Sequence, residues 1–106
     1  MLITEQSVSQ LPGAQGVAML MLADGREPTH TRIDIAHLKQ GASLPKHRAG
    51  STQQFYVISG HGRVASTDDI EHSISPGTLV KWEPGEEHTS WADTDMTVLI
   101  IQYRPT

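Results

Sequence analysis

The stretch GASLPKHRAGSTQQFYVISG, residues 41–60, decides the fold of this chain. Its second half alternates in character, and successive side chains of a strand point to opposite faces, so Gln53, Phe55 and Val57 share one face. Gly60 closes the stretch with a residue that turns without steric penalty. The stretch therefore predicts a β-strand that carries a glutamine among the apolar side chains of its inner face. By the same alternation, His47 and Ala49 share a face.

A second stretch, GTLVKWEPGEEHTSWA at residues 77–92, has a similar design. Lys81 is expected to point to water, which turns Val80 and Trp82 inward on the same strand. After the turn at EPGEE, His88 and Ser90 share one face of the next strand. Both stretches thus place polar side chains on faces that are otherwise apolar.

The rest of the chain consists of short apolar segments separated by Gly, Pro and Asp clusters, which is typical of an all-β fold. Residues 1–16 are mostly polar and are expected to form an N-terminal arm, and residues 17–106 a single barrel domain. We expect strands at 17–23, 32–38, 44–48, 53–59, 61–66, 70–74, 78–82, 87–92 and 96–103. About nine short strands in this length predict a β-sandwich or a small barrel.

At this point the first stretch resembles the first motif of the cupin family. Gly41, His47 and Gly60 match that motif at the correct spacing, and Gln53 falls where the family has a glutamate. Ala49 stands in place of the second histidine of the motif, and alanine has no donor atom. Some metal-binding cupins use glutamine in place of glutamate, so Gln53 alone does not remove a metal site.

The second stretch resembles the second cupin motif. Gly77, Gly85 and His88 fit at the right spacing, whereas Glu83 takes the place of a proline and Ala92 that of an asparagine. The resemblance covers roughly residues 30–103. It implies a double-stranded, jelly-roll-like β-barrel of two packed antiparallel sheets. It also implies a homodimer, to which the N-terminal arm offers a strand for exchange.

The resemblance further implies a divalent metal site, in which His47, Gln53 and His88 would hold Fe, Mn, Ni, Zn or Cu. Two imidazoles and an amide oxygen bring no ligand charge, so such a site would bind weakly. A fourth ligand is an open question. If Ile33 and Ile35 face the core, alternation places His37 on their side. A small-molecule pocket is expected to be lined by Ala49, Phe55, Val57, Val80, Trp82 and Ser90.

Two functions remain open at this stage. One is an enzyme whose weak metal site supports isomerase, lyase, cyclase or oxygenase-type chemistry on a small substrate. The other is a metal-free, non-catalytic barrel that binds a small molecule. Arg48 and Arg63 are candidates for binding an anionic substrate, and Glu86 or Glu87 for a general base. For these four residues, a solvated side chain is the ordinary alternative.

Composition excludes several other classes of protein. The chain has 106 residues, no cysteine and a net charge of −4, so disulfides and thiolate chemistry are ruled out. No cluster of Lys or Arg could follow a phosphate backbone, so we expect no nucleic-acid partner. The longest apolar run, VAMLMLA at residues 17–23, is too short to span a bilayer, and the N-terminus lacks the pattern of a signal peptide. We therefore expect a cytoplasmic protein that acts away from membranes.

Overall fold

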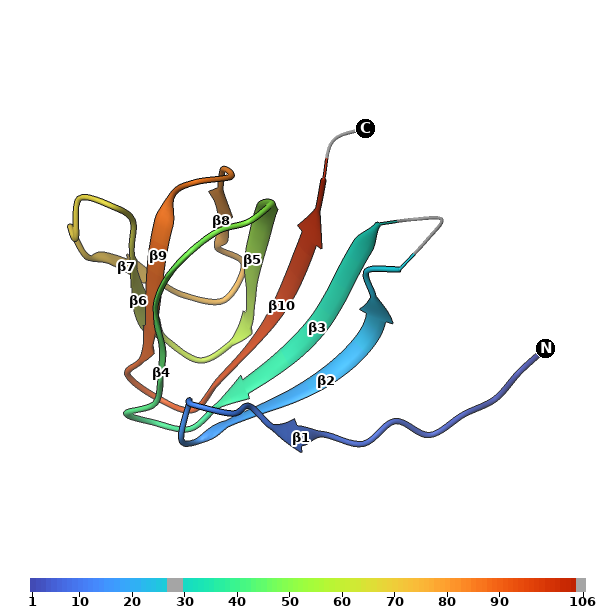
Figure 1. Cartoon of the computed structure of the whole chain (residues 1–106). Helices are drawn as coiled ribbons and strands as arrows, with labels where there is room; N and C mark the ends of the chain where they lie inside the picture. The colour runs from blue at the N-terminus through green and yellow to red at the C-terminus, as the bar shows by residue number, and fades with distance from the viewer. Residues whose placement is uncertain (27–29, 105–106) are drawn as a thin grey trace.

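A computed structural model describes residues 1–26 and 30–104 of the chain, and ten strands run through these residues (Figure 1). They are β1 (Ser9–Gln10), β2 (Val17–Asp24), β3 (Thr31–Leu38), β4 (Ser43–Arg48), β5 (Thr52–Ser59), β6 (Gly62–Ala65), β7 (His72–Ile74), β8 (Leu79–Trp82), β9 (Glu87–Ala92) and β10 (Met96–Tyr103). Within the described residues there is no helix long and apolar enough to cross a membrane.

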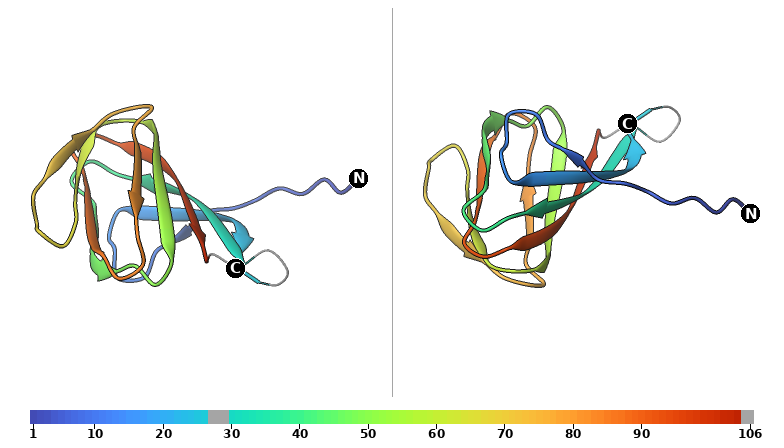
Figure 2. Two further views of the ribbon diagram at one scale, coloured as in Figure 1. Left: turned by 90° about the horizontal axis from the view of Figure 1, so that it is seen from above. Right: turned by 90° about the horizontal axis from the view of Figure 1, so that it is seen from below.

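The strands form two antiparallel sheets. The larger has six strands in the order β1-β2-β3-β10-β5-β8, and the smaller has four in the order β4-β9-β6-β7. The sheets curl around a common interior, and the segment before β1 projects away from them (Figure 2). The predicted all-β fold of two packed antiparallel sheets is confirmed.

The core between the sheets is built from the inward-facing residues of both. Phe55, Val57 and Val98 are almost completely buried there, and Trp82 lies at the edge of the same cluster. Removing apolar side chains from water supplies the main driving force for such packing. The inward parity predicted for β5 and β8 therefore agrees with the burial of Phe55, Val57 and Trp82.

Each of the nine expected strands overlaps a strand of the structure, with ends that differ by up to two residues. Strand β1 was not expected; it pairs with β2 through Ser9 opposite Met19 and Gln10 opposite Ala18. The expected arm of residues 1–16 therefore contains a short strand attached to the larger sheet. The division at residue 16 stays a prediction, and residues 105–106 of the expected domain lie outside the described residues.

The condition under which His37 would face the core is not met. Asp34, Ala36 and Leu38 are the buried side chains of this strand. Ile33, Ile35 and His37 occupy the opposite face, which is the outer face of the larger sheet. Because β3 carries apolar residues on both faces, alternation within the strand does not decide which face is inward.

Those isoleucines belong to an apolar outer face. Strand pairing places five apolar side chains side by side across five strands, and we call this set the outer row: Leu20, Ile35, Leu99, Tyr56 and Leu79. Tyr56 and Leu79 are exposed, and the other three are partly buried. The outer row explains the second apolar face of β3. The predicted homodimer is not tested by a single chain and stays a prediction.

The turn at Gly60 joins the two sheets and requires glycine. Its φ is +85°, a region that side chains rarely adopt, and a Cβ atom there would lie 2.1 Å from the backbone oxygen of Asp95. Gly77 has a similar φ of +91° but no atom within 4 Å of the position a Cβ would take. The two glycines thus share a backbone conformation and differ in the space around them.

We expect Gly60→Ala to lower the free energy of unfolding by about 3 kcal/mol or more. The new Cβ atom would strain a left-handed backbone and would also clash with the backbone of Asp95. Gly77→Ala, the matched control, adds strain alone and should lower it by about 1–2 kcal/mol. Urea denaturation of the two variants and the wild type measures both values. Equal losses would contradict the packing assigned to Gly60.

Candidate functional site

A pair of histidines connects β4 and β9 at one end of the barrel. His47 lies opposite His88 in the strand register, and the centroids of their rings are 3.9 Å apart with a tilt of 58°. The Nδ1–H of His47 donates a hydrogen bond of 2.9 Å to the carbonyl oxygen of Pro45. This bond fixes the tautomer and leaves Nε2 of His47 as a hydrogen-bond acceptor.

His88 is the buried member of the pair, with 4% of its surface exposed. Its ring packs on Trp82 at a centroid distance of 4.6 Å, and Phe55 meets Trp82 edge-on at 5.7 Å. Among the described residues, nothing hydrogen-bonds Nε2 of His88. Burial, together with a smaller effect of the nearby His47, lowers the pKa of His88 from 6.5 to about 4, although Glu86 acts in the opposite direction. His88 is therefore a neutral imidazole at pH 7.

A cavity of about 210 Å³ lies beside this pair. Its polar lining comes from four strands and consists of Arg32, Asp34, His47, Gln53 and Gln102. The apolar remainder is Leu11, Met19, Leu44 and Ile100. The polar side chains converge because Gln53 lies opposite Gln102 and Gln102 lies opposite Arg32, which makes a polar row across β5, β10 and β3.

The structure brings the three expected metal ligands close together. His47 and Gln53 line the same cavity, and His88 touches His47. The side chains expected to line a pocket lie in the barrel interior: Ala49, Phe55, Val57, Trp82 and Ser90 are buried, and Val80 is half-buried. Their role in binding a ligand stays a prediction.

Sequence reasoning missed three polar residues of the cavity, namely Arg32, Asp34 and Gln102. A signal for Asp34 was present, because it shares parity with Ala36 and Leu38. Because Ile33 and Ile35 are apolar as well, alternation left the inward face of β3 undecided. Gln102 shares parity with Ile100 and Val98 in the same way, so its inward direction follows once β10 is oriented by its buried residues.

The other candidates lie outside the cavity. His37 is exposed on the outer face of the larger sheet, where its Nδ1 lies 3.1 Å from Thr97 Oγ1. The histidine pair lies on the other side of that sheet. Arg63 forms ion pairs with Glu71 and Asp93, which raise the pKa of its guanidinium, and Arg48 is exposed.

The carboxylates of the turn before His88 are engaged elsewhere. The Glu86 carboxylate accepts hydrogen bonds from Ser66 Oγ and from the backbone N–H of Glu83. These two bonds lower the pKa of Glu86, in that order of strength. Glu87 pairs with Lys46 at 3.3 Å. Both carboxylate oxygens of Glu86 therefore have partners, and the bond to Glu83 stabilises the turn that contains Glu86.

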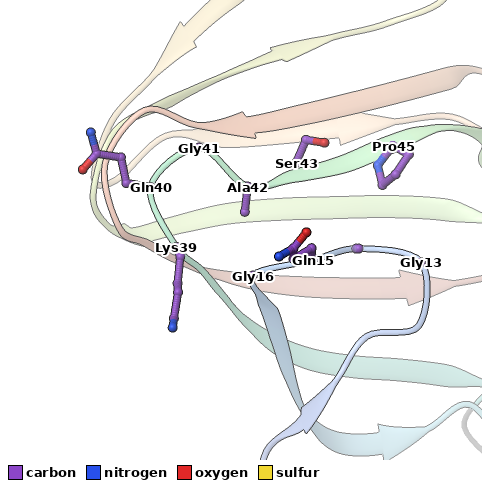
Figure 3. Close-up of a pocket in the computed structure, with 10 residues that line it drawn as sticks. Gly13, Gln15, Gly16, Lys39, Gln40, Gly41, Ala42, Ser43 and Pro45 are labelled. Carbon is purple, nitrogen blue, oxygen red and sulfur yellow. The ribbon is translucent and has the colours of Figure 1, made fainter.

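A larger hollow, of about 440 Å³, lies near the start of β4 and carries less chemistry (Figure 3). It is walled mostly by backbone and small residues from 13–16 and 39–43. Lys39, its one charged lining residue, extends away from it (Figure 3). The smaller cavity beside the histidines is the better candidate because its polar side chains converge.

The two histidine rings do not fit a shared metal ion as they are placed. Two imidazoles bound to one tetrahedral zinc at about 2.0–2.1 Å keep their centroids about 5 Å apart. Here that separation is 3.9 Å. In residues 1–26 and 30–104, no three His, Cys, Asp or Glu side chains group around a candidate metal position. Coordination by His47, Gln53 and His88 requires the exposed His47 ring to move, and this ligand set stays a prediction.

Comparisons with known proteins identify the family. Residues 34–102 match the family model described as Cupin domain, so the chain belongs to the cupin family. A curated relative, the L-ectoine synthase of Hahella chejuensis (strain KCTC 2396), is 34% identical over 68 residues. That alignment takes in 63% of this chain and 52% of the synthase, so the chain spans about half of this relative.

Solved structures agree on the fold. A cupin-like protein from Thermotoga maritima MSB8 superimposes with a TM-score of 0.83 at 18% identity, covering 98% of this chain and 82% of that one. An RmlC-like cupin from Shewanella frigidimarina NCIMB 400 gives 0.82 at 17% identity, covering 95% and 86%. The chain is therefore a cupin domain with a distant relative among enzymes.

The lowered pKa of His88 predicts a pH-dependent stability. The folded-state pKa lies below the unfolded one, so protons bind more tightly to the unfolded chain. The free energy of unfolding should be greatest above about pH 6.5 and fall by roughly 2–3 kcal/mol as the pH drops toward 4. His88→Gln should remove most of this slope in urea titrations between pH 7 and pH 4. The control His72→Gln, at an exposed position, should keep it; an unchanged slope in His88→Gln would refute the assignment.

Proposed function

We propose that this cupin domain binds a small polar molecule in the cavity beside the histidine pair. The supporting observation is the convergence of five polar side chains from four strands on one cavity with apolar walls, which is the usual design of a small-molecule site. The cavity of about 210 Å³ is small for such sites. Since a water molecule occupies about 30 Å³ of liquid, the ligand is of the order of seven non-hydrogen atoms.

His47 is the group best placed to move a proton in this site. It lines the cavity, and the hydrogen bond from its Nδ1–H to Pro45 leaves an accepting Nε2. A neutral imidazole within reach of a bound ligand is a common general base. The distant relationship to L-ectoine synthase supports an enzymatic role, although the match spans about half of that protein.

A pocket-filling substitution tests ligand binding. Leu44 lines the cavity, so Leu44→Trp should occupy the space and weaken binding of any cavity ligand by at least tenfold. Leu79→Trp makes the same change on the outer row and should leave binding intact. The measurement is a panel of small polar metabolites titrated into ¹⁵N-labelled protein, with backbone shifts followed by NMR. Shifts that cluster away from the cavity, or that survive Leu44→Trp unchanged, would contradict the proposal.

Metal binding by His47, Gln53 and His88 is a second candidate, favoured by the unpartnered Nε2 of His88. Because the rings must separate and the set carries no charge, we expect weak binding of Ni²⁺.

Calorimetric titration of Ni²⁺ into metal-free protein checks this candidate. His88→Phe should abolish the binding, while His37→Phe should leave it unchanged, because His37 lies on the outer face. Equal affinity in the wild type and His88→Phe would remove the candidate.

A further inference from the structure

Asp34 is a carboxylate buried on the inner face of β3, with none of its surface exposed. Its Oδ2 accepts a hydrogen bond of 2.9 Å from Nε of Arg32, whose side chain is 48% exposed. Its Oδ1 is also buried, and no described group donates a hydrogen bond to it. One oxygen of this carboxylate is thus satisfied and the other is not.

The two residues directly opposite Asp34 offer no replacement donor. Its register partners are Ile100 on β10 and Met21 on β2, and both have apolar side chains. Leaving a buried acceptor without a partner is unfavourable by about 1–3 kcal/mol, and more for a charged group. Such groups in folded proteins call for a specific explanation, of which a ligand is one.

Asp34 also lies where two cavities meet. It lines the cavity of about 210 Å³ beside His47, and also a second cavity of about 340 Å³ under the N-terminal segment. Arg32, Leu11 and Met19 line both as well. The Arg32 side chain therefore reaches the space in which the proposed ligand would sit, and the Asp34 carboxylate lies in the wall directly behind it, so a ligand donor meets Oδ1 once the lining shifts.

We propose that the Arg32–Asp34 pair recognises a small carboxylate that carries an amine or a hydroxyl group on the neighbouring carbon. This inference rests on the proposed function and names its ligand class. The donor of the ligand hydrogen-bonds to Oδ1 of Asp34, and its carboxylate pairs with the terminal nitrogens of Arg32. Only Nε of Arg32 is engaged with Asp34, so the planar end of the guanidinium is available for such pairing.

Charge supports this choice of ligand. Arg32 and Asp34 cancel each other, and His88 is neutral at pH 7. A ligand with a carboxylate alone would bring a negative charge toward Asp34 with no compensating donor. A ligand that adds an ammonium or hydroxyl group places that donor against Asp34 and its carboxylate against Arg32. The pairs then lie head to tail, as complementary recognition requires.

Three compounds of matched size test the inference: butyrate, 2-hydroxybutyrate and 2-aminobutyrate. We expect NMR titration of the full chain to place their binding at Arg32 and Asp34, with the amino or hydroxy compound binding at least tenfold more tightly than butyrate. Absence of this preference in the wild type overturns the inference. A different outcome separates the inference from the proposed function. If none of the three compounds perturbs the site, but another metabolite binds there and Leu44→Trp excludes it, the inference fails and the proposed function stands.

Asp34→Asn tests the role of the carboxylate itself. In this variant Arg32 Nε–H still donates its hydrogen bond to the amide oxygen of the new side chain. The NH₂ group then takes the place of Oδ1, and it repels a hydrogen-bond donor on the ligand. The preference for the amino and hydroxy compounds should disappear. Asp24→Asn is the matched control, because Asp24 forms a similar pair with Arg26 at 3.2 Å but on the exposed surface. It should keep the preference.

The thermal midpoint separates recognition from a structural role. Removing a buried charge with one unsatisfied oxygen should leave the midpoint of Asp34→Asn equal to or above that of the wild type, as sites kept for function often behave. Retention of the tenfold preference in folded Asp34→Asn overturns the inference. If that variant does not fold, Arg32→Gln decides: it must weaken 2-aminobutyrate binding by at least tenfold, and unchanged binding overturns the inference.

Discussion

Strand β10 is the element on which the rest of the structure depends. It is hydrogen-bonded on both sides over its length, to β3 and to β5, and so fixes the register of the larger sheet. Its inward residues Val98 and Ile100 build the core. Its end places Gln102 between Gln53 and Arg32, and its outward Leu99 occupies the centre of the outer row. A shift of one residue in this register would exchange the core and the outer row.

The interior of the barrel changes from apolar to polar along these strands. Trp82, which packs edge-on against Phe55, covers the ring of His88, and the burial of His88 keeps its imidazole neutral. One step further, Gln53 and Gln102 face the cavity, and Asp34 lies at its border with the space under the N-terminal segment. The side chains that stabilise the fold thus set the properties of the side chains that can meet a ligand, because both sets alternate along the same strands.

Much of the fold could be predicted from the sequence because turns and alternation are local signals. Gly60 and Gly77 mark turns, and the parity of Gln53, Phe55 and Val57 follows from a single strand. Which face of β3 is inward could not be predicted that way, because β3 is apolar on both faces and the decision depends on the register with β10. For the same reason, the inward position of Asp34 could not be predicted.

The contact between His47 and His88 depends equally on pairing between distant segments. Alternation placed His47 on the face of Ala49 and His88 on the face of Ser90, but it gave no distance between the two histidines. The resemblance to cupins implied a metal site at His47, Gln53 and His88. The packing of the two histidine rings follows instead from the register of β4 with β9. Sequence patterns and the resemblance therefore named the residues of the candidate site and left its geometry undetermined.

The outermost strands of the two sheets are short or interrupted. The larger sheet ends in β1 and β8, of two and four residues, and Lys81 lies within β8. The smaller ends in β7, of three residues, and in β4, where Pro45 lacks an N–H and the register is irregular. Unpaired edges are where foreign strands add and aggregates begin to grow. A small barrel with such edges presents little continuous backbone for that growth, even though the outer row leaves one of its faces apolar.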